Sequence, residues 1–250
     1  MKKIREVKIS KITKLSTNFK IVTFTGDDLN DFPTLKNGGY IKLLFSEKPL
    51  DLSYQFVRPF TIKNFSREKL ELEILFTNLQ SSSGLASKWS QKIKINDKIL
   101  ISGPGSNKSL SLLSKWYLFI GDFTALAAIS VYLKNLDEKS RGLAIIEIKS
   151  KKDKIELEKP ANFEIKWVLS SKVNNFSQYK NKLHNITWLS HQPFVWAACE
   201  FELMKKLRNF LIKDKEILKE NIYISSYWKK GLDQEEHKII KKKDFQKWES

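Results

Sequence analysis

Apolar and polar residues alternate in short runs along the first hundred residues, which is the pattern of half-buried β-strands. These runs are rich in β-branched and aromatic side chains, and turn-forming residues separate them. Several short strands at this spacing predict a small antiparallel barrel, with one helix inserted near residues 85–90. We expect the strands at residues 4–9, 19–24, 40–45, 60–65, 70–76 and 99–102, the last one ending at Gly103-Pro104-Gly105.

The pattern changes after a Gly/Ser/Asn-rich stretch at residues 105–114, where short apolar runs begin to alternate with helical patterns. Strands that alternate with helices indicate a parallel sheet with helical crossovers. We therefore predict a barrel domain over residues 1–108 and an α/β domain over residues 109–250. Its strands are expected at residues 116–120, 143–148, 163–169, 194–198 and 221–225, and its helices at residues 125–136 and 201–211.

The composition of the 250-residue chain is ordinary for a globular protein, with 41% hydrophobic and 29% charged residues. Its single cysteine, Cys199, excludes an internal disulfide framework and a four-cysteine metal site. Three histidines leave little room for a histidine-based metal centre, so no metal site is predicted. The N-terminal ten residues have no apolar signal-peptide core, and the apolar runs at 126–133 and 194–199 are too short to span a membrane. We expect a cytoplasmic monomer without membrane insertion.

The net charge of +17 is the one unusual number. Only five of the 45 basic residues are arginine, the residue that grips phosphates in bidentate fashion, and the longest basic run is 241–243. The lysine excess is explained by a bias of the whole composition, or by attraction of an anionic partner. No nucleic-acid partner is predicted, because the lysines are dispersed.

One tetrapeptide in the barrel region, Arg58-Pro59-Phe60-Thr61, resembles the R-x-[YF]-[ST] motif of the ferredoxin-reductase-like flavoproteins. In that motif the aromatic ring packs on the isoalloxazine, the hydroxyl bonds near flavin N5, and the arginine neutralises the pyrophosphate. The same four residues could also be an edge-strand proline, an exposed arginine and a core phenylalanine.

Further motifs follow in the order found in one branch of those flavoproteins, the siderophore-interacting flavin reductases. The resemblance covers about residues 38–237. The matching segments are Tyr40–Leu43 for H-x-K-L, 84–89 for G-x-A-S-x-W, 102–105 for the G-P-G that ends the barrel, 121–125 for G-D-x-T-A, 195–200 for W-x-A-G-E, and 225–231 for G-Y-W-[RK]-[RK]-G.

This resemblance implies a reductase that passes electrons from NADPH or NADH through FAD, held between the two domains, to the Fe(III) of an anionic siderophore. It assigns no acid or base catalyst. Helix 85–90 would meet the flavin phosphates with its backbone amides. The implied cofactor contacts are Arg58, Phe60 and Thr61, then Gly84, Ala86, Ser87 and Thr124, with Cys199 and Glu200 on the nicotinamide side. The implied docking cations for the siderophore are Lys42, Lys229 and Lys230.

Four positions depart from the family pattern. Phe60 replaces the usual tyrosine and so lacks one hydroxyl, and Thr77 lies near the family's histidine in a connection about three residues longer. Phe123 replaces an acidic residue. Cys199 replaces a glycine, where its sulfur could crowd the nicotinamide or simply be a small buried apolar group.

Three other functions stay open from the residues alone. The chain could reduce a different acceptor, such as ferredoxin, free flavin or a quinone. It could bind FAD yet have lost the use of nicotinamide. It could also be a non-enzymatic basic binding module on the same fold, which would bind nucleic acid with steep salt dependence.

Overall fold

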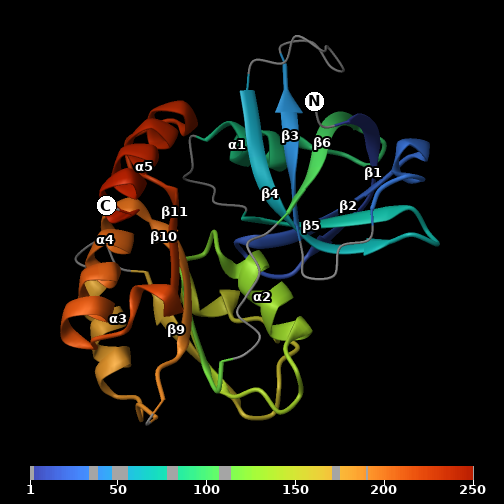
Figure 1. The fold of residues 1–250 in the computed structure, drawn as a ribbon. Helices are drawn as coiled ribbons and strands as arrows, with labels where there is room; N and C mark the ends of the chain where they lie inside the picture. The colour runs from blue at the N-terminus through green and yellow to red at the C-terminus, as the bar shows by residue number, and fades with distance from the viewer. Residues whose placement is uncertain are drawn as a thin grey trace. The chain divides into compact units, whose positions relative to one another are not determined.

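The computed structural model describes residues 3–33, 39–46, 56–77, 84–106, 114–170, 175–189 and 191–249. The chain folds into two compact units. The first consists of Met1–Ser109 together with two short pieces, Ser130–Asn135 and Ile155–Leu157, and the second holds the remaining residues from Leu110 onward. Figure 1 shows a barrel in the first unit and a sheet flanked by helices in the second.

The first unit is a closed antiparallel barrel with the strand order β1-β2-β5-β4-β3-β6, which confirms the predicted barrel. Alternate side chains point inward, and those of Ile41 and Leu43 in β3 are fully buried. The elements are β1 (Ile4–Lys14), β2 (Phe19–Thr25), η1 (Asp27–Leu29), β3 (Gly39–Phe45), β4 (Phe56–Ser66), β5 (Glu71–Thr77), α1 (Leu85–Lys92) and β6 (Lys98–Ser106).

Strand β6 does not end at Gly103-Pro104-Gly105, so the predicted end at residue 102 was wrong. The strand continues to Ser106 because β3 pairs with it on both sides of a bulge between Tyr40 and Lys42. Gly105 leaves room there for the Tyr40 ring, since a Cβ atom would lie 2.2 Å from its Cζ and the ring would have to move. Tertiary pairing thus overrides two residue types that usually break a strand.

The second unit holds a five-stranded parallel sheet with the order β11-β10-β7-β8-β9, which confirms the predicted α/β class. Every residue of the central strand β7 is buried, as expected for a strand covered on both faces. The strands are β7 (Tyr117–Gly121), β8 (Gly142–Ile148), β9 (Phe163–Leu169), β10 (Phe194–Glu200) and β11 (Ile222–Trp228).

Helices α3 and α4 pack on one face of this sheet, where Tyr179 and Leu183 of α3 share a core with Leu143 of β8. The helices are α2 (Leu126–Asn135), α3 (Asn175–His184), α4 (Phe201–Asn209) and α5 (Gln234–Glu249). Short turns lie at η2 (Lys151–Asp153), η3 (Phe210–Asp214) and η4 (Lys219–Asn221).

The order of the strands indicates where along the edge of the sheet a ligand would bind. The chain runs from β7 outward to β8 and β9, then returns to the other side of β7 with β10 and β11. In open α/β sheets, ligands bind beyond the carboxyl ends of the strands where the order reverses. That point lies between the ends of β7 and β10, which are Gly121 and Glu200.

Candidate functional site

The barrel unit contributes Arg58, Phe60 and Thr61 from β4 and Lys42 from β3. Lys42 pairs with Pro59 across the two strands, so regular alternation places Lys42 and Thr61 on the same face. Arg58 and Phe60 belong to the opposite face of the strand. Among the described residues, the Arg58 guanidinium donates one hydrogen bond, to the neighbouring Val57 carbonyl at 3.0 Å, and lies 5.9 Å from the centre of the Phe56 ring. A guanidinium has five N–H groups, so further donors can serve a ligand.

The Phe60 ring packs at the edge of the barrel core rather than standing free. It meets the Phe76 ring with centroids 4.5 Å apart, and Phe76 in turn meets Trp89 of α1 at 5.9 Å. These contacts fix the position of the Phe60 ring without needing the hydroxyl that a tyrosine would carry. The ring itself stays half-buried, so part of it is accessible to a ligand.

Helix α1 begins at Leu85, and its N-cap residue is Gly84, which has no side chain of its own to cap the helix. The small residues Gly84, Ala86 and Ser87 at this helix start let a ligand approach the backbone closely. Such an amide-rich helix start attracts phosphate. The residues that precede Gly84, including 78–83 after Thr77, lie outside the described part of the chain.

In the second unit, Asp122 organises the turn that follows β7. Its buried carboxylate accepts hydrogen bonds from the backbone N–H and hydroxyl of Thr124, at 2.8 and 2.5 Å, and from the indole N–H of Trp228, at 2.7 Å. Burial raises the pKa of Asp122, while these hydrogen bonds oppose the shift. The Thr124 hydroxyl is thereby committed to Asp122, so Thr124 shapes the turn in addition to any cofactor contact.

Glu200 closes the N-terminus of α4 with its own side chain. One carboxylate oxygen accepts from the backbone N–H groups of Glu202 and Leu203, at 2.7 and 3.2 Å, and the other accepts from the backbone N–H of Lys230. This cap occupies the place where an anion would otherwise bind. The structure therefore gives Glu200 a positioning role at the predicted nicotinamide side.

The predicted docking lysines of this unit differ in availability. The Lys229 ammonium donates to the Glu202 carboxylate at 2.5 Å, and this hydrogen bond lowers the pKa of Glu202. Lys230 is exposed, and its ammonium has no ion pair among the residues that the structure describes. Of these two lysines, Lys230 is thus the freer cation.

Cys199 lies in the core of the second unit with no exposed surface. Burial, followed by the nearby Asp122 and Glu200 carboxylates, raises the pKa of its thiol well above the usual range. The thiol is therefore protonated and faces side chains of the core, which favours the interpretation of Cys199 as a small apolar residue.

Phe123, which stands where the family has an acidic residue, joins an aromatic group at the same edge of the sheet. Its ring centroid lies 5.8 Å from that of Trp228, and the Lys149 ammonium lies 4.3 Å from the ring centre. A cation above an aromatic face replaces the charge pair that an acid would have made there.

The sequence patterns did not predict that Tyr179 and Trp228 stabilise the carboxyl edge of the sheet near Gly121 and Asp122. The Tyr179 hydroxyl donates to the Gly121 carbonyl at 2.9 Å, with the buried Glu147 carboxylate 3.3 Å away. Tyr179 sits on α3, which was not predicted, although Phe176, Tyr179 and Leu183 have helical spacing. Trp228 lay inside a matched motif, but nothing in the motif shows that its indole binds Asp122.

His237 of α5 leads to a prediction about pH. Its Nε2 lies 2.8 Å from the Ser226 hydroxyl, while its Nδ1 is buried without a partner in the described part of the chain. Burial, and then the positive charge of Lys241, lowers the pKa of His237 from 6.5 to about 4, with Lys229 acting in the same direction and Glu200 against it. The unfolded state therefore binds a proton at a higher pH than the folded state does. As a result, the free energy of unfolding is greatest above pH 6.5 and decreases as the pH falls from 6.5 toward about 4.

We therefore expect the wild-type protein to lose about 2 kcal/mol more unfolding free energy between pH 7.5 and 4.5 than the variant His237→Gln. Urea unfolding at both pH values measures this difference. His191→Gln is the matched control, because His191 lies outside this contact and should leave the pH dependence unchanged. Equal pH dependence in wild type and His237→Gln would contradict the prediction.

Within the described ranges, no three His, Cys, Asp or Glu side chains come together as a possible metal site. In the same ranges, no helix is both long enough and apolar enough to cross a membrane.

A closed six-stranded antiparallel barrel, followed by a five-stranded parallel sheet with helices, defines the ferredoxin-reductase-like class of folds. Two family models narrow this class. The model for the siderophore-interacting FAD-binding domain matches residues 8–54 and 51–108, and the model for the siderophore-interacting protein matches residues 114–231. The chain belongs to the siderophore-interacting protein family.

Individual relatives agree with this assignment. The chain is 24% identical over 246 residues to the ferric vibriobactin reductase ViuB of Vibrio cholerae, covering 88% of each protein. It is 26% identical over 210 residues to the ferric acinetobactin reductase of Acinetobacter baumannii, covering 82% of this chain and 71% of that protein. Among solved structures, the siderophore-interacting protein SipS from Aeromonas hydrophila is similar, with a TM-score of 0.86, 25% identity and coverage of 98% and 99%.

Proposed function

We propose that this protein is an FAD-dependent ferric-siderophore reductase that uses NADPH or NADH. The observation that carries the proposal is that one chain holds a siderophore-interacting FAD-binding barrel and a siderophore-interacting sheet unit in sequence, over nearly its whole length. The relatives named as ferric vibriobactin and ferric acinetobactin reductases support the substrate class.

The residues of the barrel unit fit FAD. The guanidinium of Arg58 offers charged donors to the pyrophosphate, the half-buried ring of Phe60 offers a flat apolar contact, and Thr61 offers a hydroxyl. The start of α1, with the small residues Gly84, Ala86 and Ser87, suits the same phosphates. Bound FAD would supply the redox chemistry, taking two electrons as a hydride and passing them on singly to two Fe(III) ions.

The sheet unit would bind the nicotinamide nucleotide at the ends of β7 and β10. Asp122 and Glu200 hold the two turns there in shape, through Thr124 and Trp228 and through the first turn of α4. Neither residue is required to move a proton, because transfer of a hydride and of single electrons needs no acid or base. The chain's task is to bind, to orient and to exclude competing acceptors.

Lys42 and Lys230 are the cations that we assign to an anionic ferric chelate, with Lys229 as a weaker contributor because it is paired with Glu202. Charge attraction of this kind raises the association rate and weakens with salt. Reduction to Fe(II) releases the metal, because ferrous iron holds hard oxygen ligands less strongly.

The test is anaerobic turnover of the FAD-loaded protein with NADPH or NADH and a ferric catecholate chelate, with Fe(II) trapped by a coloured chelator. We expect Lys42→Gln with Lys230→Gln to raise KM for the chelate several-fold and to leave turnover of a neutral quinone unchanged. The control pair Lys69→Gln and Lys213→Gln removes the same charge elsewhere and should leave both unchanged. Rapid reduction of quinone, ferredoxin or free flavin with no Fe(II) formed would assign a different acceptor.

A further inference from the structure

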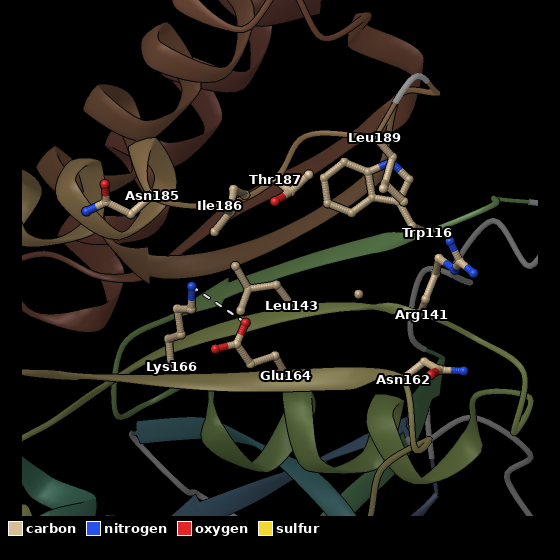
Figure 2. A pocket seen from close by; sticks show the side chains of 11 residues that line it. Trp116, Arg141, Leu143, Asn162, Glu164, Lys166, Asn185, Ile186, Thr187 and Leu189 are labelled. Carbon is tan, nitrogen blue, oxygen red and sulfur yellow. Dashed lines mark ion pairs between the residues drawn. The ribbon is translucent and has the colours of Figure 1, made fainter.

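A cleft of about 440 Å³ opens at the amino ends of β7, β8 and β9, within the size range of small-molecule sites. Trp116 and Leu143 form its floor and are only 3% and 5% exposed. The segment that follows α3, residues 185–189, forms the opposite wall, where Ile186 and Leu189 offer the more accessible apolar surface (Figure 2). None of the motifs that resemble the family lies in this wall.

The carboxyl ends of β7 and β10, at Gly121–Asp122 and Glu200, form the proposed nucleotide site, which we call the nucleotide turn. The cleft lies at the opposite edge of the sheet. Trp116 precedes β7, whereas Gly121 and Asp122 end it, and a five-residue strand separates its two ends by roughly 13 Å. Because β7, β8 and β9 are parallel, the amino ends of all three lie together at this edge. A ligand in the cleft would therefore not touch Asp122 or Glu200.

Polar groups gather at the two ends of the cleft, with an apolar surface between them (Figure 2). Gly142 pairs with Phe163, so Arg141 and Asn162 come side by side at one end. At the other end, Lys166 lies 3.5 Å from Glu164 in an ion pair. Lys166 of β9 follows Asn162 by four positions, which is roughly 13 Å along an extended strand. Leu143 and Ile186 line the space between.

The polar side chains at the Arg141 end of the cleft are available to a ligand. The Arg141 guanidinium makes no hydrogen bond or ion pair in the part of the chain that the structure describes, and the same holds for the side-chain amide of Asn162. A guanidinium presents parallel N–H groups that match a carboxylate, and the adjacent amide adds a further donor. By contrast, Glu164 and Lys166 largely neutralise each other at the far end.

We propose that this cleft binds a small amphipathic carboxylate, made of one ring or short apolar chain and one carboxylate group. The carboxylate would lie on the exposed Arg141 and Asn162, and the ring would lie against Ile186 and Leu189, above the floor that Leu143 and Trp116 form. A polar substituent at the far end of the ligand would reach Lys166 or Glu164. This site does not depend on the reductase activity and is separate from the nucleotide turn.

The test uses 4-fluorobenzoate as the probe and follows its ¹⁹F NMR line width as the full-length protein is added. We expect saturable broadening with wild type, and about 10-fold or greater weakening of binding in Arg141→Gln. Lys139→Gln is the matched control, since it removes an exposed cation two residues away and should leave binding unchanged. The cation 4-fluorobenzylamine should not broaden, because Arg141 would repel it.

A repeat with saturating NADPH separates the two edges of the sheet. Broadening that persists supports the cleft, whereas broadening that NADPH abolishes would place the probe at the nucleotide turn and overturn the proposal. Unchanged binding in Arg141→Gln, or equal broadening by the amine, would also overturn it. Asn162→Ala gives a second variant, for which a smaller loss of affinity is expected. All of these outcomes are independent of whether the protein reduces iron.

Discussion

The paired substitution Arg58→Gln and Thr61→Val is expected to weaken FAD binding about 100-fold. Losing one charge-assisted and one neutral hydrogen bond costs about 3 kcal/mol in total. The barrel should stay folded, because the one hydrogen bond that the Arg58 side chain makes to a described residue goes to the adjacent Val57 carbonyl, and Thr61 lies within strand β4. Fluorescence titration with FAD measures the affinity, and circular dichroism measures thermal unfolding.

Lys69→Gln is the control for this experiment, since it removes a positive charge from the exposed turn between β4 and β5. The single variants carry further information, because Arg58 and Thr61 point to opposite faces of the strand. A loss confined to Arg58→Gln would show that only the face shared with Phe60 meets the cofactor. Unchanged FAD affinity in the double variant would contradict the assigned flavin contacts.

Replacing Asp122 by Asn is expected to lower the unfolding free energy by about 2–3 kcal/mol. The new amide group would direct N–H donors toward Trp228 or Thr124, whose own donors now bind the carboxylate. Trp228→Phe removes one of these donors and should cost about 2 kcal/mol. The double variant should lose less than the sum of the two, with a coupling of about 1.5 kcal/mol, because both changes remove the same hydrogen bond.

Wild type, the two single variants and the double variant form a double-mutant cycle, and urea unfolding measures the free energy of unfolding of each. Trp188→Phe provides the matched control, because its indole donates to the Leu183 carbonyl, away from Asp122. Combined with Asp122→Asn, it should be additive within about 0.5 kcal/mol. Strict additivity of Asp122→Asn and Trp228→Phe would show that the 2.7 Å contact does not support the turn.

The strands were largely predictable because each carries its own apolar pattern, and β9 was predicted at its observed bounds. Helix α5 was not, since its apolar side chains have no regular stripe and it packs through a few residues such as Ile240 and His237. Its start did carry a signal, because Asp233 and Glu236 form the D-x-x-E pattern of a capping box.

The sequence motifs located the segments that form the candidate site, but they did not predict which side chains contact one another there. The sequence placed Glu200 at a strand-to-helix turn, but only the structure shows that its carboxylate caps α4 and holds Lys230. The pairing of Lys229 with Glu202 and the full burial of Cys199 likewise depend on tertiary packing. Such contacts join residues up to a hundred positions apart, as Asp122 and Trp228 do, and local pattern does not encode them.

The visible absorption spectrum of the purified protein, taken with FAD and then with NADPH or NADH under anaerobic conditions, tests the central claim most directly. We expect tightly bound flavin with its yellow absorption bands, bleaching when the nicotinamide is added, and recovery of the bands when a ferric siderophore follows. A colourless protein that takes up no FAD would contradict the account, and so would bound flavin that stays oxidised with both nicotinamides.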